Sequence, residues 1–542
     1  MHFTRILAAF VACCMAVSVR AQSNATTAAV NLTEQAAPMA EQVVDPCGPR
    51  IRKPWDRLTP MEKDVYIRAL ERSMDDGLYI KFVEIHTEQM TTAEAHRTCM
   101  FLYWHRLLLL GFENMLRSYG GEFSCITVPY WDYVAHNSRF LRGQCASMED
   151  CSPILQELGG SSRGQTESVT VNGRPVQGTC VASRPLNHFC EASHLSGRAC
   201  ARCVPRGDWT QASFPGSTTV SSLMRQLFSS PTIDGVATNL EQGIHNTIHN
   251  ALDGVMGVLE APADPIFWSH HATIDLLHSI FYHCAVGNTE SMPLENKLAD
   301  PRQYVQCARR SPLPVRQAVD RNVLLPQSEV TLRSGENGMM PESVRDPRNP
   351  LFPVFASLPT EYLSLSDIRD MGPFSYNYEM SGELASMFTT CADLTTVIRG
   401  APRQAMRRPV SAGFGGLRRL EKQAESSLLE AVIVPNEQST TDTASDWYRT
   451  ALRAALSAAN AAAASNPSVS PTSVALKEVE KMTCMFYDEC RGHVTDFSAA
   501  FRASFHTNAS TPCFAIVDNI KNGRDTLLVT NWKELMLQFF SC

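Results

Sequence analysis

The sequence predicts a mainly α-helical protein with small β-hairpin excursions and a cysteine-containing C-terminal extension. Apolar residues recur at helical spacing from about residue 49 to 135 and again from 220 to 285. With 542 residues, 44% of them apolar, the chain can bury a large core and form more than one domain. Its net charge of −7 argues against nucleic acid as a partner, because phosphate groups repel an acidic surface.

The first residues have the pattern of a secretory signal peptide. A basic start is followed by an uncharged apolar stretch over residues 6–19 and by a small residue, Ala21. We therefore expect residues 1–21 to be a cleaved leader and 22–48 to be a polar N-terminal segment of a secreted protein. No later run is apolar over the roughly 20 residues that a membrane span needs, so no membrane span is expected.

Cysteine usage favours the same oxidising compartment. Two of the 18 cysteines lie in the expected leader, which leaves an even number suited to disulfides. Asn24, Asn31 and Asn508 begin N-glycosylation sequons. The sequence therefore indicates a secreted, disulfide-bonded glycoprotein.

One folded domain is expected over residues 49–390. Thr59, Pro60 and Glu62 have the arrangement of a capping box with proline in the first helical turn, which predicts a helix start. Residues 140–215 are a cysteine-rich insertion. Within it, the pair Asn172-Gly173 between valine-rich flanks predicts a hairpin.

The composition changes at about residue 391. An arginine-rich run and then an alanine-rich stretch predict a linker with helical pieces over residues 391–475. Residues 476–542 are expected to form a small domain, whose limited core needs disulfide staples. Two disulfides are expected there, among Cys484, Cys490, Cys513 and Cys542.

Two groups of three histidines are the candidate metal ligands. They are His86, His96 and His105 in the first helical block, and His245, His249 and His271 in the second. Imidazole suits copper and zinc, and His245 and His249 share one helix face because they are four residues apart. His105 lies in a strongly apolar helix, where a buried imidazole needs a partner. Because neighbouring helical residues point about 100° apart, His270 and His271 are not expected to face the same ion.

These residues make the chain resemble the tyrosinase family of type 3 copper proteins. The resemblance rests on four motifs: EAH at 94–96, FLYWHR at 101–106, HNTIH at 245–249 and DPIFWSHHATID at 264–275. It also includes RKPWDRLTPMEK at 52–63 and the pair Tyr376 and Tyr378, so it spans roughly residues 50–385. It implies a type 3 copper domain whose ligands lie on a central four-helix arrangement. It also implies two copper ions per chain with O2 as co-substrate. The ligands it implies are His86, His96 and His105 for copper A, and His245, His249 and His271 for copper B.

The resemblance further implies a secreted tyrosinase-like copper oxidase. Such an enzyme hydroxylates monophenols in the ortho position and oxidises o-diphenols to o-quinones, so phenolic small molecules or tyrosyl groups are the expected substrates. Two alternatives stay open: a catechol oxidase restricted to diphenols, and a haemocyanin-like O2-binding protein without catalysis. Val258 stands where some members carry a bulky residue over the second copper, and this small residue favours catalysis.

Four further residues are candidates for roles around the metals. Glu241 and Asn246 could together hold a water that takes the phenol proton, although Glu241 could equally be a plain polar helix residue. Asp275 could orient an imidazole or make structural hydrogen bonds. Phe267 is expected to pack beside the site.

The resemblance also bears on Glu94 and Cys99. Some members carry a cysteine bonded to a histidine two residues before the second ligand, but this chain has Glu94 there, so no thioether is expected at that position. Cys99 is instead expected to form a disulfide or to be a buried thiol. Disulfides are also favoured over a zinc site for the run His188, Cys190, His194, Cys200 and Cys203, whose spacing fits no common zinc finger.

Some family members are made as proenzymes in which a C-terminal domain covers the copper site. In this chain the sequence CMFYDEC offers Phe486 or Tyr487 as the residue that would occupy the substrate pocket. The same two residues could instead be core residues of the small domain.

Overall fold

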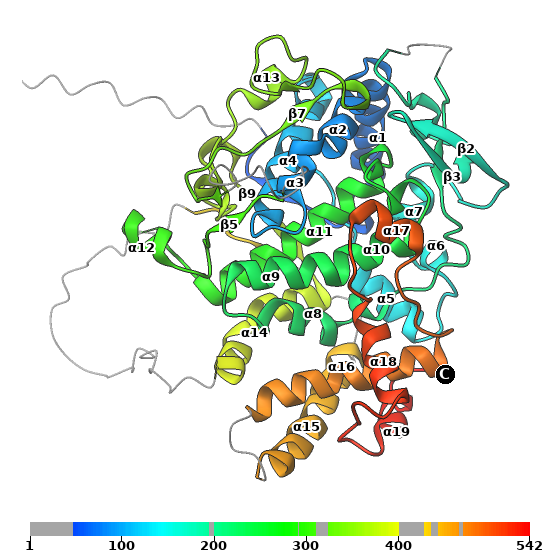
Figure 1. Ribbon diagram of the computed structural model, residues 1–542, viewed down its shortest axis with the longest axis vertical. Helices are drawn as coiled ribbons and strands as arrows, with labels where there is room; N and C mark the ends of the chain where they lie inside the picture. Colours follow the sequence, from blue (N-terminus) through cyan, green and yellow to red (C-terminus); the bar gives the residue numbers. More distant parts are fainter. Residues whose placement is uncertain are drawn as a thin grey trace, which may run out of the picture. The chain divides into compact units, whose positions relative to one another are not determined.

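The computed structural model describes residues 47–194, 200–290, 292–310, 323–399, 428–434, 443–464 and 470–542. Helices dominate this part of the chain, which confirms the predicted mainly α fold (Figure 1). The expected leader and the arginine-rich part of the expected linker lie outside the described residues. Among the described residues, no helix is both long enough and apolar enough to span a bilayer.

The first helical block begins as its capping box predicts. The Glu62 backbone N–H donates to the Thr59 hydroxyl at 3.2 Å, and the Glu62 carboxylate accepts from the Thr59 N–H at 2.7 Å. The fourth helix is buried along almost its whole length. The block contains α1 (Pro60–Asp75), α2 (Leu78–Thr87), α3 (Gln89–Ala95), α4 (Phe101–Arg117) and α5 (Tyr133–Leu141).

The second helical block completes the core. It contains α8 (Val220–Phe228), α9 (Ile233–Leu240), α10 (Asn246–Leu252) and α11 (Ile266–Phe281), with a π-helical turn over Glu241–His245 between α9 and α10. Every residue of α11 is buried, and α11 packs against α4. Helices α2, α4, α10 and α11 together carry most of the candidate ligands (Figure 1).

Small sheets and short helices frame these blocks. β1 (Arg50–Arg52), β9 (Tyr376–Met380) and β10 (Val432–Ile433) form one parallel sheet, whose register pairs Arg52 with Tyr378. β2 (Thr166–Val171), β3 (Arg174–Val181) and β4 (Val204–Arg206) form an antiparallel one. The remaining pieces are α6 (Met148–Cys151), α7 (Pro153–Glu157), α12 (Leu294–Ala299), α13 (Phe352–Phe355), and the two strand pairs β5 (Cys307–Ala308) with β6 (Val323–Leu324) and β7 (Arg333–Ser334) with β8 (Glu342–Ser343).

The β2–β3 hairpin turns where the sequence predicts it. Asn172 and Gly173 both have positive φ, 44° and 82°, as a two-residue hairpin turn of this type requires. The Asn172 side chain donates a hydrogen bond to the Thr87 hydroxyl at 2.9 Å. The hairpin is thereby connected to the end of α2.

Disulfides join all 16 cysteines from Cys47 onward. The pair Cys99–Cys307 confirms the expected disulfide of Cys99. The cysteines of the run from His188 to Cys203 form disulfides, which confirms that prediction over a zinc site. The eight pairs are Cys47–Cys125, Cys99–Cys307, Cys145–Cys151, Cys180–Cys203, Cys190–Cys200, Cys284–Cys391, Cys484–Cys513 and Cys490–Cys542. The last two are the two expected in the C-terminal segment.

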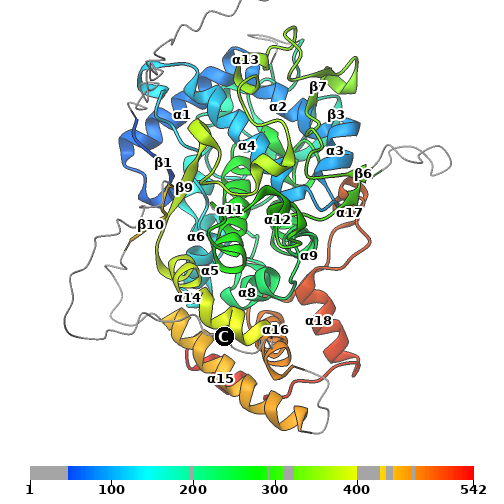
Figure 2. The ribbon, with the colours of Figure 1, turned by 90° about the vertical axis from the view of Figure 1, so that its left-hand side faces the viewer.

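The alanine-rich stretch forms a helix that packs on the C-terminal segment. Helix α15 (Thr443–Ala463) lies against α16 (Pro471–Cys490), as Figure 2 shows. Ala451, Ala455 and Ala459 recur at four-residue spacing, so they lie on one face of α15, and all three are fully buried. Their small side chains let the neighbouring element approach closely. The range expected as a linker thus contains a packed helix, preceded by the end of α14 (Gly382–Arg399).

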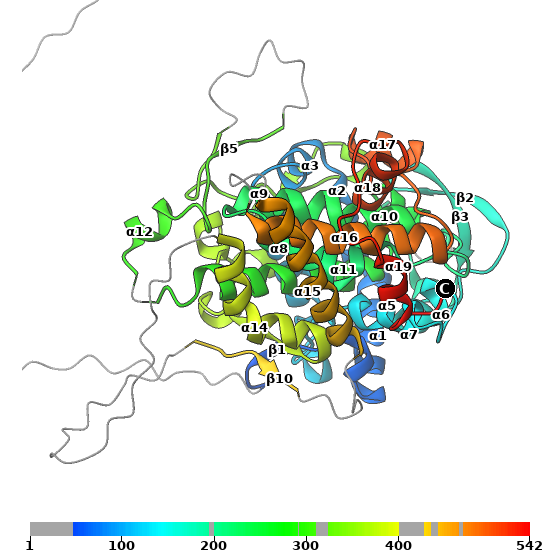
Figure 3. The same ribbon diagram turned by 90° about the horizontal axis from the view of Figure 1, so that it is seen from below.

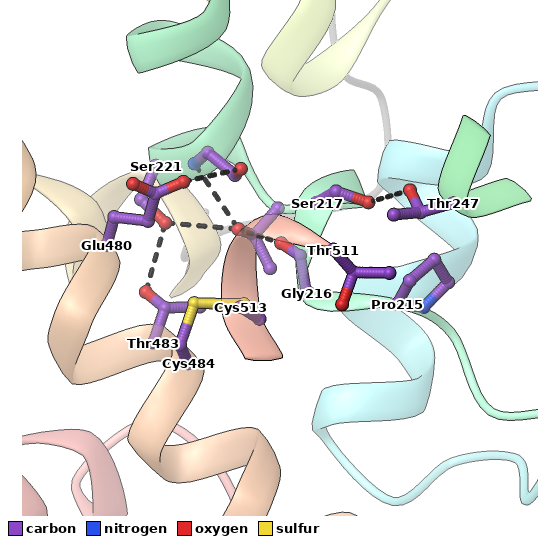
Figure 4. The surroundings of a disulfide bond; sticks show 12 residues. Pro215, Gly216, Ser217, Ser221, Thr247, Glu480, Thr483, Cys484, Thr511 and Cys513 are labelled. Carbon is purple, nitrogen blue, oxygen red and sulfur yellow. Dashed lines mark hydrogen bonds between the residues drawn. A yellow bond between two sulfur atoms is a disulfide. The ribbon is translucent and has the colours of Figure 1, made fainter. Parts of the chain in front are cut away.

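Helix α16 lies against α8 (Figure 3) and is anchored there by buried polar side chains. The Ser222 hydroxyl donates to the Glu480 carboxylate at 3.0 Å, and Arg225 forms an ion pair with the same carboxylate. Figure 4 shows that the disulfide Cys484–Cys513 then joins α16 to α18 (Pro512–Lys521). Gly216 lies against this disulfide: a Cβ there would come 2.6 Å from the Cys513 sulfur. The segment ends in α19 (Trp532–Leu537).

Candidate metal centre

The first histidine trio is brought together from three helices. His86 lies on α2, His96 caps the end of α3, and His105 lies on α4. Their ring centroids are 4.8 Å (His86 to His96), 5.2 Å (His96 to His105) and 5.8 Å (His86 to His105) apart. Their ligand-capable atoms lie within 4.8 Å of one another, a spacing at which three imidazoles can hold one ion.

The second trio faces the first. His245 ends the π-helical turn, His249 lies on α10 and His271 on α11. Their centroids are 4.5 Å (His245 to His249), 5.0 Å (His245 to His271) and 5.8 Å (His249 to His271) apart. The rings of His105 and His271 stack with centroids 4.3 Å apart, which brings the two trios into direct contact.

His270 departs from the expectation that it turns away from the second trio. Its ligand-capable atoms belong to one group with those of His245, His249 and His271, all within 4.8 Å of one another. The two neighbouring rings do point differently, with 71° between their planes, but the imidazole is long enough for both to reach the group. His270 stacks on His245 and lies 6.1 Å from the Tyr133 ring, whereas His271 stacks toward the first trio.

The hydrogen bonds of the imidazoles fit metal binding through Nε2. In five of the six predicted ligands, Nδ1 lies within hydrogen-bond distance of an oxygen. Backbone carbonyls serve three of them: Leu259 for His86 (2.6 Å), Phe101 for His105 (2.9 Å) and Met256 for His249 (2.7 Å). Side chains serve the other two: the Thr92 hydroxyl for His96 (3.1 Å) and the Asn246 carbonyl oxygen for His245 (2.9 Å). All six Nε2 atoms are buried and have no hydrogen-bond partner among the described residues. A bond from Nδ1–H to an oxygen fixes the tautomer whose Nε2 lone pair is free, as metal ligation requires. The residues present therefore fit two copper ions.

Burial also keeps these imidazoles neutral. It lowers the pKa of His249 to about 3 and the pKa of His86 to about 4. The pKa values of His96, His105, His245 and His271 are lowered by burial and further by neighbouring histidines. A neutral imidazole has the lone pair that a metal needs, so no proton has to be displaced near pH 7.

Glu241 and Asn246, predicted to hold a water together, each make hydrogen bonds with neighbouring groups of the protein. Both Glu241 carboxylate oxygens accept from the backbone N–H of Arg97, at 2.8 and 2.9 Å. Asn246 accepts from His245 and donates to the Gln242 side chain at 3.4 Å. Burial raises the pKa of Glu241 to about 7. Asn246 thus orients the ring of the predicted ligand His245, and Glu241 holds the backbone that follows His96.

Asp275 makes structural interactions rather than orienting an imidazole. It accepts from Arg106 Nε at 2.6 Å, from Arg52 at 3.3 Å, and from the hydroxyls of Tyr376 and Tyr378 at 2.5 and 2.6 Å. Burial alone would raise the pKa of Asp275, but the two guanidinium groups outweigh it and hold the pKa below its ordinary value. Arg106 directly follows His105, so this cluster links the α4 and α11 ligands.

Phe267 lies beside the site, where it was expected. Its ring centroid is 4.2 Å from that of His271, 5.2 Å from His86 and 6.1 Å from His249. Val258 is half-buried and directly precedes Leu259, whose carbonyl accepts from His86. Phe267 thus belongs to the apolar surroundings of the imidazoles, and Val258 packs against the hydrophobic core.

Phe505 is the residue that lies over the histidines. It ends α17 (Ala499–Phe505), drawn in red in Figure 1, and its ring centroid is 5.4 Å from His249, 6.0 Å from His96 and 6.4 Å from His245. The ring stacks on Phe501. We refer to residues 497–509, which include α17, as the cover.

The two residues proposed from the sequence for this position lie elsewhere. Phe486 packs against Phe540, with centroids 5.9 Å apart, and the Tyr487 hydroxyl donates to Asn137 at 2.6 Å. Both are on α16, whose place is fixed by its contact with α8. The signal that could have identified the cover is the i, i+4 spacing of phenylalanines 497, 501 and 505, which gives one aromatic helix face.

Comparison with known proteins agrees with this geometry. Residues 76–283 match the family model of the common central domain of tyrosinase. The tyrosinase of Streptomyces lincolnensis is 30% identical over 246 residues, which cover 42% of this chain and 80% of that protein. The tyrosinase of Streptomyces glaucescens is 29% identical over 250 residues, with the same coverage.

Among solved structures, a polyphenol oxidase mutant from Thermothelomyces thermophila is similar at 21% identity, with a TM-score of 0.31 over 44% of this chain and 73% of that one. All six predicted ligands fall within the range matched by the family model, and the cover falls outside it.

Replacing Asp275 tests the cluster that links α4 and α11. Asp275→Asn leaves Arg106 buried without its carboxylate, so we expect the protein to lose about 3–5 kcal/mol of stability and to melt at a lower temperature. Asp346→Asn is the matched control, because it removes the same charge from an exposed ion pair with Arg348. Equal melting temperatures for the two variants would show that the cluster is not structural.

Two neighbouring substitutions test which α11 histidine is a ligand. His271→Ala is expected to reduce the bound copper from two ions to one per chain, because it leaves the second trio with only His245 and His249. His270→Ala, an equally buried neighbour, is expected to retain both ions. Metal analysis of the purified variants after copper loading measures this, and the reverse pattern would assign the site to His270.

Proposed function

The chain belongs to the tyrosinase family, and from this premise we propose that it is a secreted copper oxidase acting on phenols. It uses O2 to hydroxylate monophenols in the ortho position and to oxidise o-diphenols to o-quinones. The observation that carries the proposal is the pair of facing, buried imidazole trios whose Nε2 atoms have no other partner among the described residues.

The protein would position the two metal ions and keep water away from them. His86, His96 and His105 would hold one copper ion, and His245, His249 and His271 the other. Bound copper would supply the site for O2 and the exchange of electrons with the phenol. Neutral imidazole tolerates both Cu(I) and Cu(II), which the oxidation of a phenol by O2 requires.

Residues around the ligands keep them in place. Asn246 holds the His245 ring through its side-chain carbonyl, and three backbone carbonyls hold the rings of His86, His105 and His249. Phe267 excludes water on one side. Preorganised imidazoles of this kind lose little freedom when a metal binds.

We infer that the described form is latent. The Phe505 ring contacts His96 of one trio and His245 and His249 of the other, so a phenol ring cannot approach the same place while the cover is docked. The cover is held by hydrogen bonds from Arg97 to the His506 carbonyl (2.6 Å), from the Leu259 N–H to Ser504 (3.3 Å) and from Thr507 to Gln242 (3.0 Å).

Activity on two substrates tests the reaction type. The copper-loaded protein is assayed with a monophenol and with an o-diphenol, before and after limited proteolysis that cuts on both sides of the cover, within the loop closed by Cys484–Cys513. Turnover of both supports the proposed function, and turnover of the diphenol alone indicates a catechol oxidase. Reversible oxygenation without turnover of either would indicate an O2-binding protein.

Truncating Phe505 tests latency without proteolysis. Phe505→Ala removes a buried ring whose loss weakens docking by about 3 kcal/mol, so we expect kcat/KM to rise by at least about tenfold. Phe497→Ala, in the same aromatic stack but without a ring contact to a histidine in the described part of the chain, is expected to activate less. If proteolysis activates the protein and Phe505→Ala does not, Phe505 is not the blocking residue.

A further inference from the structure

We propose that Glu94 is a positioning residue for copper A, because it fixes the backbone that leads into the predicted ligand His96. It does so through residues 305–310, which we refer to as the brace. The proposal rests on the proposed function, since it concerns the affinity of one of the two copper ions. It distinguishes copper A, whose site depends on the brace, from copper B, whose site does not.

His96 is the member of the first trio that lies outside a helix. His86 and His105 lie within α2 and α4, whose backbone hydrogen bonds hold them. His96 instead has extended backbone, with φ of −120° and ψ of 140°, just beyond the seven residues of α3. A helix this short is not stable by itself. The position of His96 is therefore set by whatever holds the residues before and after it.

Glu94 holds the residues before His96. Its side chain is fully buried, and its four hydrogen-bond donors all come from distant parts of the chain. One carboxylate oxygen accepts from Nε of Arg309 at 2.9 Å and also from Nη2 of this residue. The other accepts from the Thr331 N–H at 2.8 Å and from the Tyr362 hydroxyl. Hydrogen bonds to a charged group are about twice as strong as neutral ones, so the end of α3 is firmly attached.

The residues after His96 are attached to the same brace. Cys99 forms a disulfide with Cys307, and its backbone N–H donates to the Cys307 sulfur at 3.2 Å. The Thr98 hydroxyl donates to the Glu94 carbonyl at 2.6 Å and so joins the two attached ends. Because both ends are bound to one short stretch of chain, His96 cannot shift without displacing that stretch.

Arg310, the last residue of the brace, reaches the group that orients the His96 ring. Its backbone N–H donates to the Ala93 carbonyl at 3.0 Å, and its Nη2 donates to the Thr92 carbonyl at 2.7 Å. The Thr92 hydroxyl in turn lies 3.1 Å from Nδ1 of His96. The brace thus holds the backbone around His96 and also the residue that sets the direction of its ring.

The second trio has a different support. Its histidines lie on the π-helical turn, α10 and α11, and within the described residues no hydrogen bond joins the brace to α10 or α11. Loss of a group that orients a metal ligand weakens metal binding by about 10- to 100-fold. We therefore expect loss of the Glu94 contacts to weaken copper A and to leave copper B unchanged.

The test measures each copper ion separately in the full chain. His249→Ala removes a predicted ligand of copper B and leaves copper A, whereas His105→Ala does the reverse. In each background the Kd for Cu(I) is measured by competition with a chromophoric Cu(I) chelator. Adding Glu94→Gln should weaken the Kd of copper A by about tenfold or more and leave that of copper B unchanged. An unchanged Kd of copper A, or an equal loss at both ions, overturns the proposal.

Arg309 provides a second route to the same contact. Arg309→Gln should weaken copper A in the same direction, and Arg309→Lys should retain part of the affinity because it keeps the charge. The double variant with Glu94→Gln should lose less than the sum of the two single losses, since both remove one ion pair. Additive losses would show that the two residues act independently and would overturn the role given to their contact.

Asp300→Asn is the matched control. Asp300 is a largely buried carboxylate that pairs with Arg302, close to the brace in sequence, and neither residue contacts the backbone around His96 among the described contacts. Its loss should leave both Kd values unchanged, and a fall at copper A equal to that of Glu94→Gln overturns the proposal.

Wild-type protein separates this proposal from the proposed function. If it binds two copper ions but oxidises no phenol, the proposed function fails and the Kd values still decide on Glu94. If it binds no copper, both fail.

Discussion

The buried ion cluster around Asp275 sets the geometry on which the metal centre depends. Arg106 follows His105 on α4, and Asp275 lies one turn after His271 on α11, so their 2.6 Å contact fixes the two helices where the two trios meet. Arg52 and the tyrosines of β9 complete the cluster, which explains why a short parallel sheet accompanies a helical core. A buried carboxylate with two buried guanidiniums tolerates little displacement, because any loss of contact exposes an uncompensated charge to a low-dielectric interior.

Burial away from water affects both the predicted ligands and the cover. The same burial that keeps the imidazoles neutral leaves their Nε2 atoms without partners among the described residues, so the centre favours whatever satisfies them. The Phe505 ring shields these imidazoles from water but offers them no lone pair. Its docking therefore depends on contacts outside the trios, and the strongest electrostatic one is at Arg97.

The sequence predicted the parts of the structure that depend on local spacing. The i, i+4 pair of His245 and His249, the capping box at Thr59 and the turn at Asn172-Gly173 are short-range patterns, and each appears where expected. Which aromatic residue covers the centre depends on how α16 docks on α8, a long-range contact that no local pattern reports. For the same reason the sequence offers Phe486 and Tyr487 as equal candidates. No local pattern indicates that Arg97 holds the cover, because its backbone conformation is fixed by Glu241, 144 residues away in the sequence.

The disulfides constrain how the cover can open. Cys484–Cys513 closes a loop that contains α17, and Cys490–Cys542 ties the following end of the chain to α16. A cut in the range 391–475 would thus leave α17 bound within its own segment, and α16 would remain on α8 through Glu480 and the serines around it. Opening then requires either that α16 separates from α8 or that α17 moves within its loop. The second route breaks only the contacts of the cover itself, namely the hydrogen bonds at Arg97, Leu259 and Gln242 and the Phe505 ring contacts, so its free-energy cost is the smaller.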